Sequence, residues 1–550
     1  MRYILVVFFI LLSYNIYSQN QYLDDIYFQD RYRVIQLFGD TGIKNSFIYR
    51  NSQTIQKFYK YNSKNSNKIL INAGQDLQYN SLLPVSYNDG NFYPARGWQY
   101  RYTIGALFSN KFIDINLQPE VINSNNKLQE NYAGNVNDGN FAARYFGYVA
   151  NNIDNYRQFG KKSIDTITWG QSRIGLKLKE LSLGVSNQNI WIGPGKRNSI
   201  TMSNNAPGFK HFYFNTNKPI QTKIGSFEFS YASGVIDTIK FKDPDEGLLS
   251  GWTAGIANKA KNKRIIDLYS ITWSPKWTPG FFVGYSYTSQ HYVTNSVIKI
   301  NNEFATLDSY NQKLGSLFFR LLLPKENAEI YGELGVPDGK PIFSNLFSDK
   351  TKSGILLGAS KLIRLSKSTN FLNFNFEITQ LQLMDSKSLF QMGNPYNNHP
   401  INSWYTNTII RQGYTNEAQI MGASIGPGSN SQTFNGSWNS SKVKIGLQLE
   451  RVAINNDFYF IQYYIGQNKP GGLNGKGAGY YNRYWVELNS SLYTEYSISD
   501  RFFLLASIMN TNSMNYRWVR NEDGSKWDKP SSLSDKYNTR LNFSMRFYLN

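Results

Sequence analysis

The chain contains no cysteine and only three histidines among its 550 residues. Without cysteine no disulfide can form, so stability must come from packing and strand pairing. His211, His291 and His399 lie far apart, and none stands in a metal-ligand spacing or beside a known nucleophile motif. Asp and Glu are plentiful, but one sequence cannot place two of them at the separation that a glycosidase needs. We therefore expect no enzyme, no catalytic residue, no metal and no cofactor.

The chain also lacks a long apolar run. Arg2 precedes a short one from Ile4 to Leu12, and Ser18 offers a small residue for cleavage. This pattern predicts a secretory signal peptide over residues 1–18. The run is too short to cross a bilayer as a helix, and no later stretch approaches the ~20 apolar residues that a spanning helix needs. The mature protein is therefore either soluble outside the cytoplasm or a barrel that crosses a membrane with strands.

Aromatic residues and positive charge are abundant. Aromatic residues make up 16% of the sequence, with 40 Tyr and 36 Phe, yet the mean hydropathy is -0.46. That combination suits alternating strands and membrane interfaces. The formal net charge is +20 and is spread along the chain, which suits a lipopolysaccharide-facing surface or an acidic polymer. We expect no nucleic-acid partner, because the protein is exported.

Apolar and polar residues alternate along several segments, with the period of two that a β-strand imposes. In the last segment one face holds Leu541, Phe543, Met545, Phe547 and Leu549, and the other holds Asn542, Ser544, Arg546 and Tyr548. Residues 98–106, 372–378 and 443–450 alternate in the same way. Charged residues such as Glu329 stand at the inward positions. Because a packed core rejects such charges and a wet lumen accepts them, we predict an all-β fold, a transmembrane antiparallel β-barrel of the outer membrane.

The connections between these segments alternate between short and long, as in barrels with tight periplasmic turns and extended outer loops. Tight turns are predicted at residues 109–111, 179–180 and 499–500. If the first strand runs through Ile69, then residues 189–223 lie at the opposite, outward end. Ordinary strand and loop lengths leave room for roughly 16 to 20 strands between Ile69 and the end of the chain.

The residues before the barrel differ in composition. Asp30 can cap a short helix with an apolar stripe that includes Leu37, and Gly39 ends it. The Asn-, Ser- and Lys-rich residues that follow are interpreted as a connector. We therefore divide the mature chain into an N-terminal periplasmic helical and connector segment, residues 19–67, and an outer-membrane β-barrel, residues 68–550.

The segment NIWIGPGKRNSITMSNNAPGF, residues 189–209, gathers aromatic, cationic and amide side chains in one loop. Sugars present apolar ring faces that suit aromatic platforms and hydroxyls that need directed hydrogen bonds, and an acidic sugar adds a reason for Lys and Arg. The candidate polysaccharide-binding residues are Trp191, Lys196, Arg197, Asn198, Asn204 and Asn205. The competing interpretation is that they only satisfy the turns of their own loop.

Two further groups of residues are interpreted structurally. Two Gly-Pro-Gly segments are expected to set the shape of their loops: Gly193, Pro194 and Gly195, and Gly426, Pro427 and Gly428. Even spacing is expected to turn Glu329, Tyr331 and Glu333 towards the lumen, in a charge network with inward Arg and Lys.

Four segments carry a resemblance to a known family. They are residues 189–209, AEIYGELG at 328–335, WYTNTIIRQGYTN followed by GASIGPGSNSQ at 404–432, and NRYWVEL at 482–488. On these segments, and in their order, the chain resembles the Wzi-type capsule assembly proteins of the bacterial outer membrane, in the branch found in Bacteroidetes. The resemblance implies an eighteen-stranded barrel with an N-terminal helical element at its periplasmic mouth. It also implies a lectin-like protein that binds capsular or surface polysaccharide and attaches it to the cell.

The alternative is an outer-membrane porin for small, anionic solutes, because a barrel with a charged lumen conducts unless its long loops fold inward. In either case we expect contacts with outer-membrane lipid and lipopolysaccharide, and a monomer.

Overall fold

The structure is a computed structural model of the chain. It describes residues 33–39, 45–50, 68–128, 149–155, 158–238, 241, 259–260, 262–293, 297–300, 303–306, 311–337, 353–365, 370–382, 403–458, 484–499, 501–516 and 535–549. The predicted signal peptide, the helix cap at Asp30, His399, Asp500 and nearly all of the predicted connector lie outside these residues.

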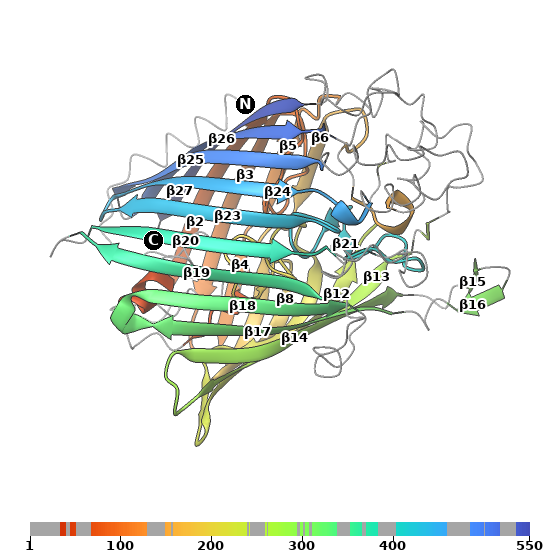
Figure 1. Cartoon of the computed structure of the whole chain (residues 1–550). Helices are drawn as coiled ribbons and strands as arrows, with labels where there is room; N and C mark the ends of the chain where they lie inside the picture. The colour runs from red at the N-terminus through yellow and green to blue at the C-terminus, as the bar shows by residue number, and fades with distance from the viewer. Residues whose placement is uncertain are drawn as a thin grey trace, which may run out of the picture.

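Eighteen antiparallel strands close into one barrel within the described residues (Figure 1). Along the chain they are β2 (Lys68–Asn80), β3 (Gly97–Ser109), β4 (Ile113–Leu117) with β5 (Glu120–Ser124), β6 (Ile164–Thr168) with β7 (Arg173–Leu178), β8 (Leu181–Ser186), β10 (Lys210–Thr216) with β11 (Ile220–Thr222), β12 (Gly225–Ile236), β13 (Arg264–Pro275), β14 (Phe281–Tyr292), β17 (Gln312–Leu323), β18 (Ala328–Pro337), β19 (Gly354–Arg364), β20 (Phe371–Gln380), β23 (Asn430–Asn439), β24 (Val443–Ala453), β25 (Val486–Ser499), β26 (Phe502–Met514) and β27 (Lys536–Leu549).

Three of these strands are interrupted, so that two segments occupy one position in the barrel. The segments β4 and β5 both pair with β3, and β10 and β11 both pair with β12. Pro119 lies in the break between β4 and β5, where its missing N–H cannot join the ladder. The barrel closes between β2 and β27, in a register that runs from Ile71↔Leu549 to Asn80↔Arg540. The predicted fold class is confirmed, as is the strand number that the resemblance implies.

Side chains alternate between the two faces of the barrel wall. In β19, Leu357 is 48% exposed on the outside, whereas Leu356 next to it is fully buried inside. In β27, Phe543 is exposed, and the hydroxyl of the neighbouring Ser544 donates to Asp76 of β2 at 2.6 Å. An apolar outer face with a polar inner face is the pattern of a strand between lipid and lumen. It confirms the facing predicted for the last strand.

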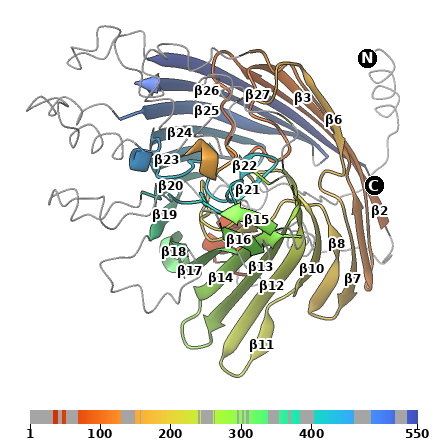
Figure 2. The ribbon, with the colours of Figure 1, turned by 90° about the vertical axis from the view of Figure 1, so that its right-hand side faces the viewer.

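The short connections gather at one end of the barrel. Residues 179–180 separate β7 from β8, and the 3-10 helix η4 (Pro324–Glu326) turns β17 into β18. The long connections lie at the other end, which Figure 2 shows facing the viewer. By the usual orientation of such barrels, the short-turn end faces the periplasm and the long-connection end faces outward.

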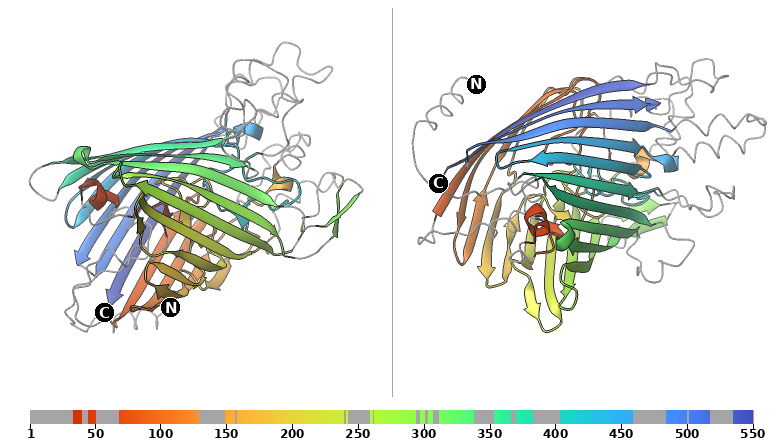
Figure 3. Two further views of the ribbon diagram at one scale, coloured as in Figure 1. Left: turned by 90° about the horizontal axis from the view of Figure 1, so that it is seen from below. Right: turned by 60° about the vertical axis from the view of Figure 1, so that its left-hand side comes forward.

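A short helix over residues 33–37 lies at the short-turn end, where Figure 3 shows it beside η4. Leu37 is fully buried and packs with Leu322 and Leu362 on the inner side of the wall. Gly39 follows the helix with a φ of 89°, a conformation that favours glycine at a helix C-terminus. Among the described residues, no helix is both long and apolar enough to cross a membrane.

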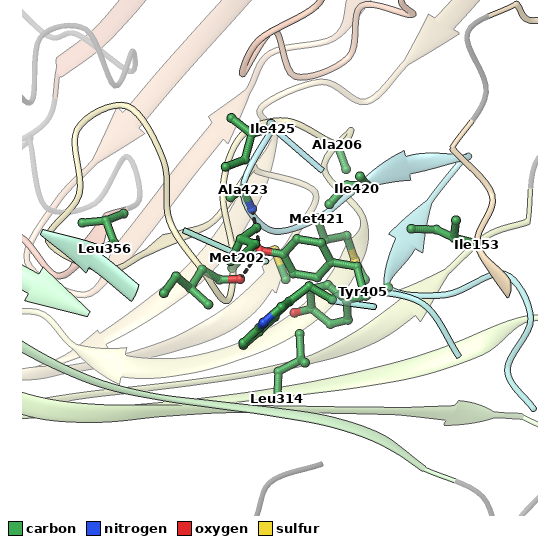
Figure 4. Packing of buried hydrophobic residues seen from close by; sticks show 14 of the residues in the cluster. Ile153, Met202, Ala206, Leu314, Leu356, Tyr405, Ile420, Met421, Ala423 and Ile425 are labelled. Atoms are coloured by element: carbon green, nitrogen blue, oxygen red, sulfur yellow. Dashed lines mark hydrogen bonds between the residues drawn. The ribbon is translucent and has the colours of Figure 1, made fainter. Parts of the chain in front are cut away.

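Two connections fold into the lumen and occupy much of it. They are residues 187–209, between β8 and β10, and residues 403–429, between β20 and β23; together we call them the plug. Most of their buried apolar side chains belong to one cluster, part of which is shown in Figure 4. The Tyr405 hydroxyl donates to the carbonyl of Ile200 at 2.8 Å and accepts the N–H of Ala423 at 2.9 Å. The hydroxyl therefore joins the two connections.

Seven further short elements of the described residues lie outside the strands of the barrel wall. In the plug, β9 (Trp191–Ile192) pairs with β1 (Tyr49–Arg50), and β21 (Thr415–Asn416) pairs with β22 (Gln419–Ile420). A hairpin of β15 (Val297–Ile300) and β16 (Glu303–Thr306) lies beyond the long-connection end, and η1 (Ala150–Asn152) is a single 3-10 turn. The β1–β9 pair joins the N-terminal segment to the plug inside the lumen.

Candidate functional site

The tip of the first plug connection is the turn Gly193-Pro194-Gly195. Two buried arginines of the N-terminal segment hold it: Arg33 Nη1 donates to the carbonyl of Pro194 at 2.8 Å, and Arg50 Nη2 donates to that of Gly195 at 2.6 Å. Gly193 has a φ of 138°, and a Cβ there would lie 1.6 Å from Glu333 Oε1. The turn therefore favours glycine at this position.

The carboxylate of Glu377, on β20, binds the backbone just after this turn. It accepts the N–H groups of Lys196 at 2.7 Å, of Arg197 at 3.1 Å and of Asn198 at 2.8 Å. Glu333 of β18 accepts the N–H of Ile200 at 2.9 Å in the same way. Two carboxyl groups of the barrel wall thus satisfy four backbone donors within residues 196–200 of the plug that would otherwise be buried without partners.

Lys196 and two arginines converge on Glu329 of β18. The Lys196 ammonium lies 3.0 Å from the carboxylate, Arg33 lies at 3.1 Å and Arg320 at 2.7 Å. Tyr331 is fully buried and donates to Glu377 at 3.0 Å. The structure thus brings Glu329, Tyr331 and Glu333 together on the inner face of β18, in contact with the plug.

Arg197 makes a two-point ion pair with Glu450 of β24, and its guanidinium lies 4.3 Å from the ring centroid of Tyr87. Burial alone would lower the pKa of Arg197, but the Glu450 carboxylate outweighs burial and raises the pKa above its usual value. Burial, followed by the charges of Glu487 and Glu450, holds the pKa of Tyr87 well above its usual value. Arg197 therefore stays charged, and the Tyr87 phenol stays protonated and donates to Glu487 at 3.0 Å.

The other candidate ligand residues lie at different depths. Trp191 is 1% exposed under the guanidinium of Arg50, and its indole nitrogen has no hydrogen-bond partner in the described part of the chain. Asn198 is fully buried and donates to Thr379 at 3.2 Å. Asn205 lines a pocket at the long-connection end, and Asn204 lines a separate inner cavity. Contact of these six residues with a polysaccharide stays a prediction.

The outer pocket has a volume of about 120 Å³ and opens among the long connections. Its lining includes aromatic residues, prolines, amides and one carboxylate: Tyr87, Trp485, Pro84, Pro427, Asn155, Asn205, Gln419, Asn455 and Glu487. Gly428, with a φ of 61°, turns the chain beneath it, and a Cβ there would lie 2.9 Å from Asn455 Oδ1. Gly426 and Pro427 are themselves part of the lining, and a shape-setting role of this segment stays a prediction.

Several residues of this site were missed by the sequence analysis. Glu377 and Glu450 stand at inward positions of alternating strands. The alternation predicts that each carboxyl group faces the lumen, but it does not predict which residue each one binds. The outer pocket residues Tyr87 and Trp485 lie far apart in the chain and carry no motif. His211 is buried in β10, where its Nδ1 lies 2.7 Å from the carbonyl oxygen of Phe209. Within the described residues, no group of three or more His, Asp or Glu side chains is placed to hold a metal ion.

A closed barrel of this kind, apolar outside and polar inside, defines the chain as an outer-membrane β-barrel protein of a bacterium. The fold is similar to that of Wzi, described as an outer membrane protein involved in group 1 capsule assembly in Escherichia coli and as a carbohydrate-binding β-barrel. The TM-score is 0.58 and the sequence identity 12%, over 95% of this chain and 98% of Wzi.

Two further solved barrels match with lower TM-scores. OccK5 (OpdH) of Pseudomonas aeruginosa has a TM-score of 0.39 and 9% identity, over 88% of this chain and 99% of that one. OccAB2 of Acinetobacter baumannii has a TM-score of 0.39 and 9% identity, over 88% and 98%. No protein-family model and no curated protein sequence matches the chain.

Proposed function

We propose that this barrel binds a capsular or surface polysaccharide at its outer pocket and attaches it to the cell, as a binding protein and not as an enzyme. The observation that carries the proposal is the outer pocket itself, formed over a plugged lumen at the long-connection end. Because the plug lies beneath the pocket, the pocket offers a binding site for a polysaccharide and not a path through the membrane.

The chemistry of the pocket suits a sugar. Tyr87 and Trp485 supply aromatic surface, and Asn155, Asn205 and Gln419 supply paired donors and acceptors. A sugar ring has apolar faces and hydroxyl edges, so it matches both kinds of lining. The carbohydrate binding described for Wzi, whose fold this chain shares, supports the same reading. Membership of the Wzi-type family, and of its Bacteroidetes branch, is part of this proposal.

The contacts between the plug and the wall disfavour the porin alternative. Carboxyl groups of the wall accept four of the plug's backbone N–H groups within residues 196–200, and most of the plug's buried apolar side chains pack into one cluster. A loop held in this way leaves the lumen only after several buried charge-assisted hydrogen bonds break, each worth roughly 1.5–3 kcal/mol.

The test is the amount of polysaccharide that stays on cells, relative to the amount shed into the medium. Ser86→Trp fills the pocket, and Asn155→Ala removes an exposed amide from its rim. Both should release polysaccharide to the medium while the barrel stays at its normal level in the outer membrane.

The matched control is Val293→Trp, which adds the same ring to an exposed position at the long-connection end outside the pocket. It should leave polysaccharide on the cells. If cells with Ser86→Trp retain as much polysaccharide as cells with Val293→Trp, the pocket does not bind the polysaccharide.

A further inference from the structure

A second, larger cavity lies inside the barrel, between the plug and the wall formed by β27, β2 and β3. Its volume of about 280 Å³ has room for roughly nine waters at ~30 Å³ each. The wall contributes inward residues such as Gln78, Thr103 and Asn542, and the plug contributes Gln188, Asn189 and Asn204. An apolar ligand would leave these groups without partners, so the cavity suits a ligand that is itself rich in hydrogen-bonding groups.

One cluster of charges gives the cavity a cationic side. Asp76 on β2 is bound by Arg101 of β3 at 2.8 Å and by Arg546 of β27 at 2.7 Å. Two guanidiniums share one carboxylate, so the cluster has a net charge of about +1. The side chains of Arg101 and Arg546 are 19% and 17% exposed, and that of Asp76 is 7% exposed. A ligand in the cavity therefore meets guanidinium edges more than carboxylate.

The wall leaves room for one of these guanidiniums. Gly74 pairs with Arg546 across the β2–β27 ladder, and a Cβ at Gly74 would lie 3.2 Å from Arg546 Nη1. The arginine therefore lies flat over the glycine, along the wall, and beside the cavity. A larger residue at position 74 would push the guanidinium towards the cavity centre.

The outward part of the cavity is different. There Arg540 pairs with Asp89 at 2.7 Å, with the carboxylate more exposed than the guanidinium, at 15% against 7%. Gln78 and Asn542 stand beside this pair in the wall register. Carboxylate and amide oxygens accept hydrogen bonds from hydroxyl groups. The cavity thus offers exposed cations towards the short turns and exposed acceptors towards the long connections.

We infer that this cavity binds a sugar acid, a ring with one carboxylate and several hydroxyls. The carboxylate lies against the exposed edges of Arg101 and Arg546, and the hydroxyls face Asp89 and the amides. Arginine suits this contact, because its planar fork matches a carboxylate. The site is separate from the outer pocket. The inference is therefore tested independently of polysaccharide retention on cells.

The first experiment compares three probes on the purified full-length protein in detergent, by titration calorimetry. Sodium D-glucuronate carries both groups, D-glucose lacks the carboxylate, and sodium acetate lacks the hydroxyls. Glucuronate should bind at least ten times more tightly than either, and its affinity should fall with added salt. Equal affinity for glucose, or no binding of glucuronate, overturns the inference.

Two substitutions in the charge cluster should act in opposite directions. Arg546→Gln removes one cation and should weaken glucuronate binding at least tenfold. Asp76→Asn keeps the shape of the side chain but removes the charge that competes for both arginines, and should tighten binding severalfold. A purely structural role for the cluster would weaken binding in both variants, which contradicts the inference.

The control is Lys361→Gln, at an exposed position outside the cavity, which should leave glucuronate affinity unchanged. Heat-modifiable migration on gels checks that each variant is folded, and the three-probe comparison on the unaltered protein stands even if one variant is not. Methyl D-glucuronide separates two sources of the ligand. If it binds as well as glucuronate, the site accepts a unit of a glycan chain. If glucuronate binds and methyl D-glucuronide does not, the ligand is a sugar acid that is not linked into a glycan chain.

Discussion

Arg197 and Glu450 are 253 residues apart in sequence and meet in a two-point ion pair, with Nε–Oε1 at 2.7 Å and Nη2–Oε2 at 2.8 Å. The arginine belongs to the plug and the glutamate to the barrel wall. The Arg197 side chain is 12% exposed and that of Glu450 is fully buried, and the ring of Tyr87 lies over the guanidinium. The pair therefore ties plug to wall directly beneath the outer pocket, which Tyr87 also lines.

Breaking this pair from one side should loosen the plug. Arg197→Met or Glu450→Gln leaves a buried group without its partner and should lower the local opening free energy of residues 196–200 by roughly 3–5 kcal/mol. Replacing both residues should cost less than the sum of the single changes. Hydrogen exchange of the backbone N–H groups of residues 196–200 measures this. Strictly additive costs would contradict a direct coupling of the two side chains.

The plug tip should not tolerate a side chain at its first glycine. Gly193→Ala places a Cβ against Glu333 and imposes a φ that costs roughly 1–3 kcal/mol, so hydrogen exchange in the tip should speed up. Gly436→Ala, in β23, meets only ordinary contacts at 3.4 Å and serves as the control. If both alanine variants exchange like the unaltered protein, the tip is not packed as described.

The outer face of the wall should reject charge more strongly than the inner face. In β24, Leu447 is 38% exposed on the outside and Gln448 faces the lumen. Near the bilayer midplane, Leu447→Lys should destabilise the barrel by about 2–4 kcal/mol, and Gln448→Lys by much less. Urea unfolding in lipid vesicles measures both. Equal losses would mean that the alternation of faces is misassigned.

The barrel was predictable because alternation is a local signal. The facing of Phe543 and Ser544, the turn at residues 179–180 and the position of the long connections all follow from a period of two and from connection length. The same alternation predicted that Glu329 faces the lumen. The resemblance to Wzi-type proteins added the strand number, which composition and length alone left between roughly 16 and 20.

The interior was not predictable in the same way. The loop of residues 189–209 was placed outward, since it leaves the barrel at the long-connection end, but its body turns back into the lumen. Contacts with residues distant in sequence hold the loop in the lumen, such as the hydrogen bond from the N–H of Asn198 to Glu377. Neither the residue types nor their spacing says which inward carboxylate meets which loop. The same holds for Asp76, whose two arginines come from strands at opposite ends of the chain.

The claim that the plug seals the lumen is tested most directly by single-channel recording of the purified full-length protein in a planar lipid bilayer. The unaltered protein should show no stable open-channel current. Glu377→Gln, which removes the charge that binds three plug N–H groups, should produce frequent transient openings, whereas Glu326→Gln at an exposed turn should not. Steady, long-lived current steps in the unaltered protein would contradict a sealed barrel and favour a porin.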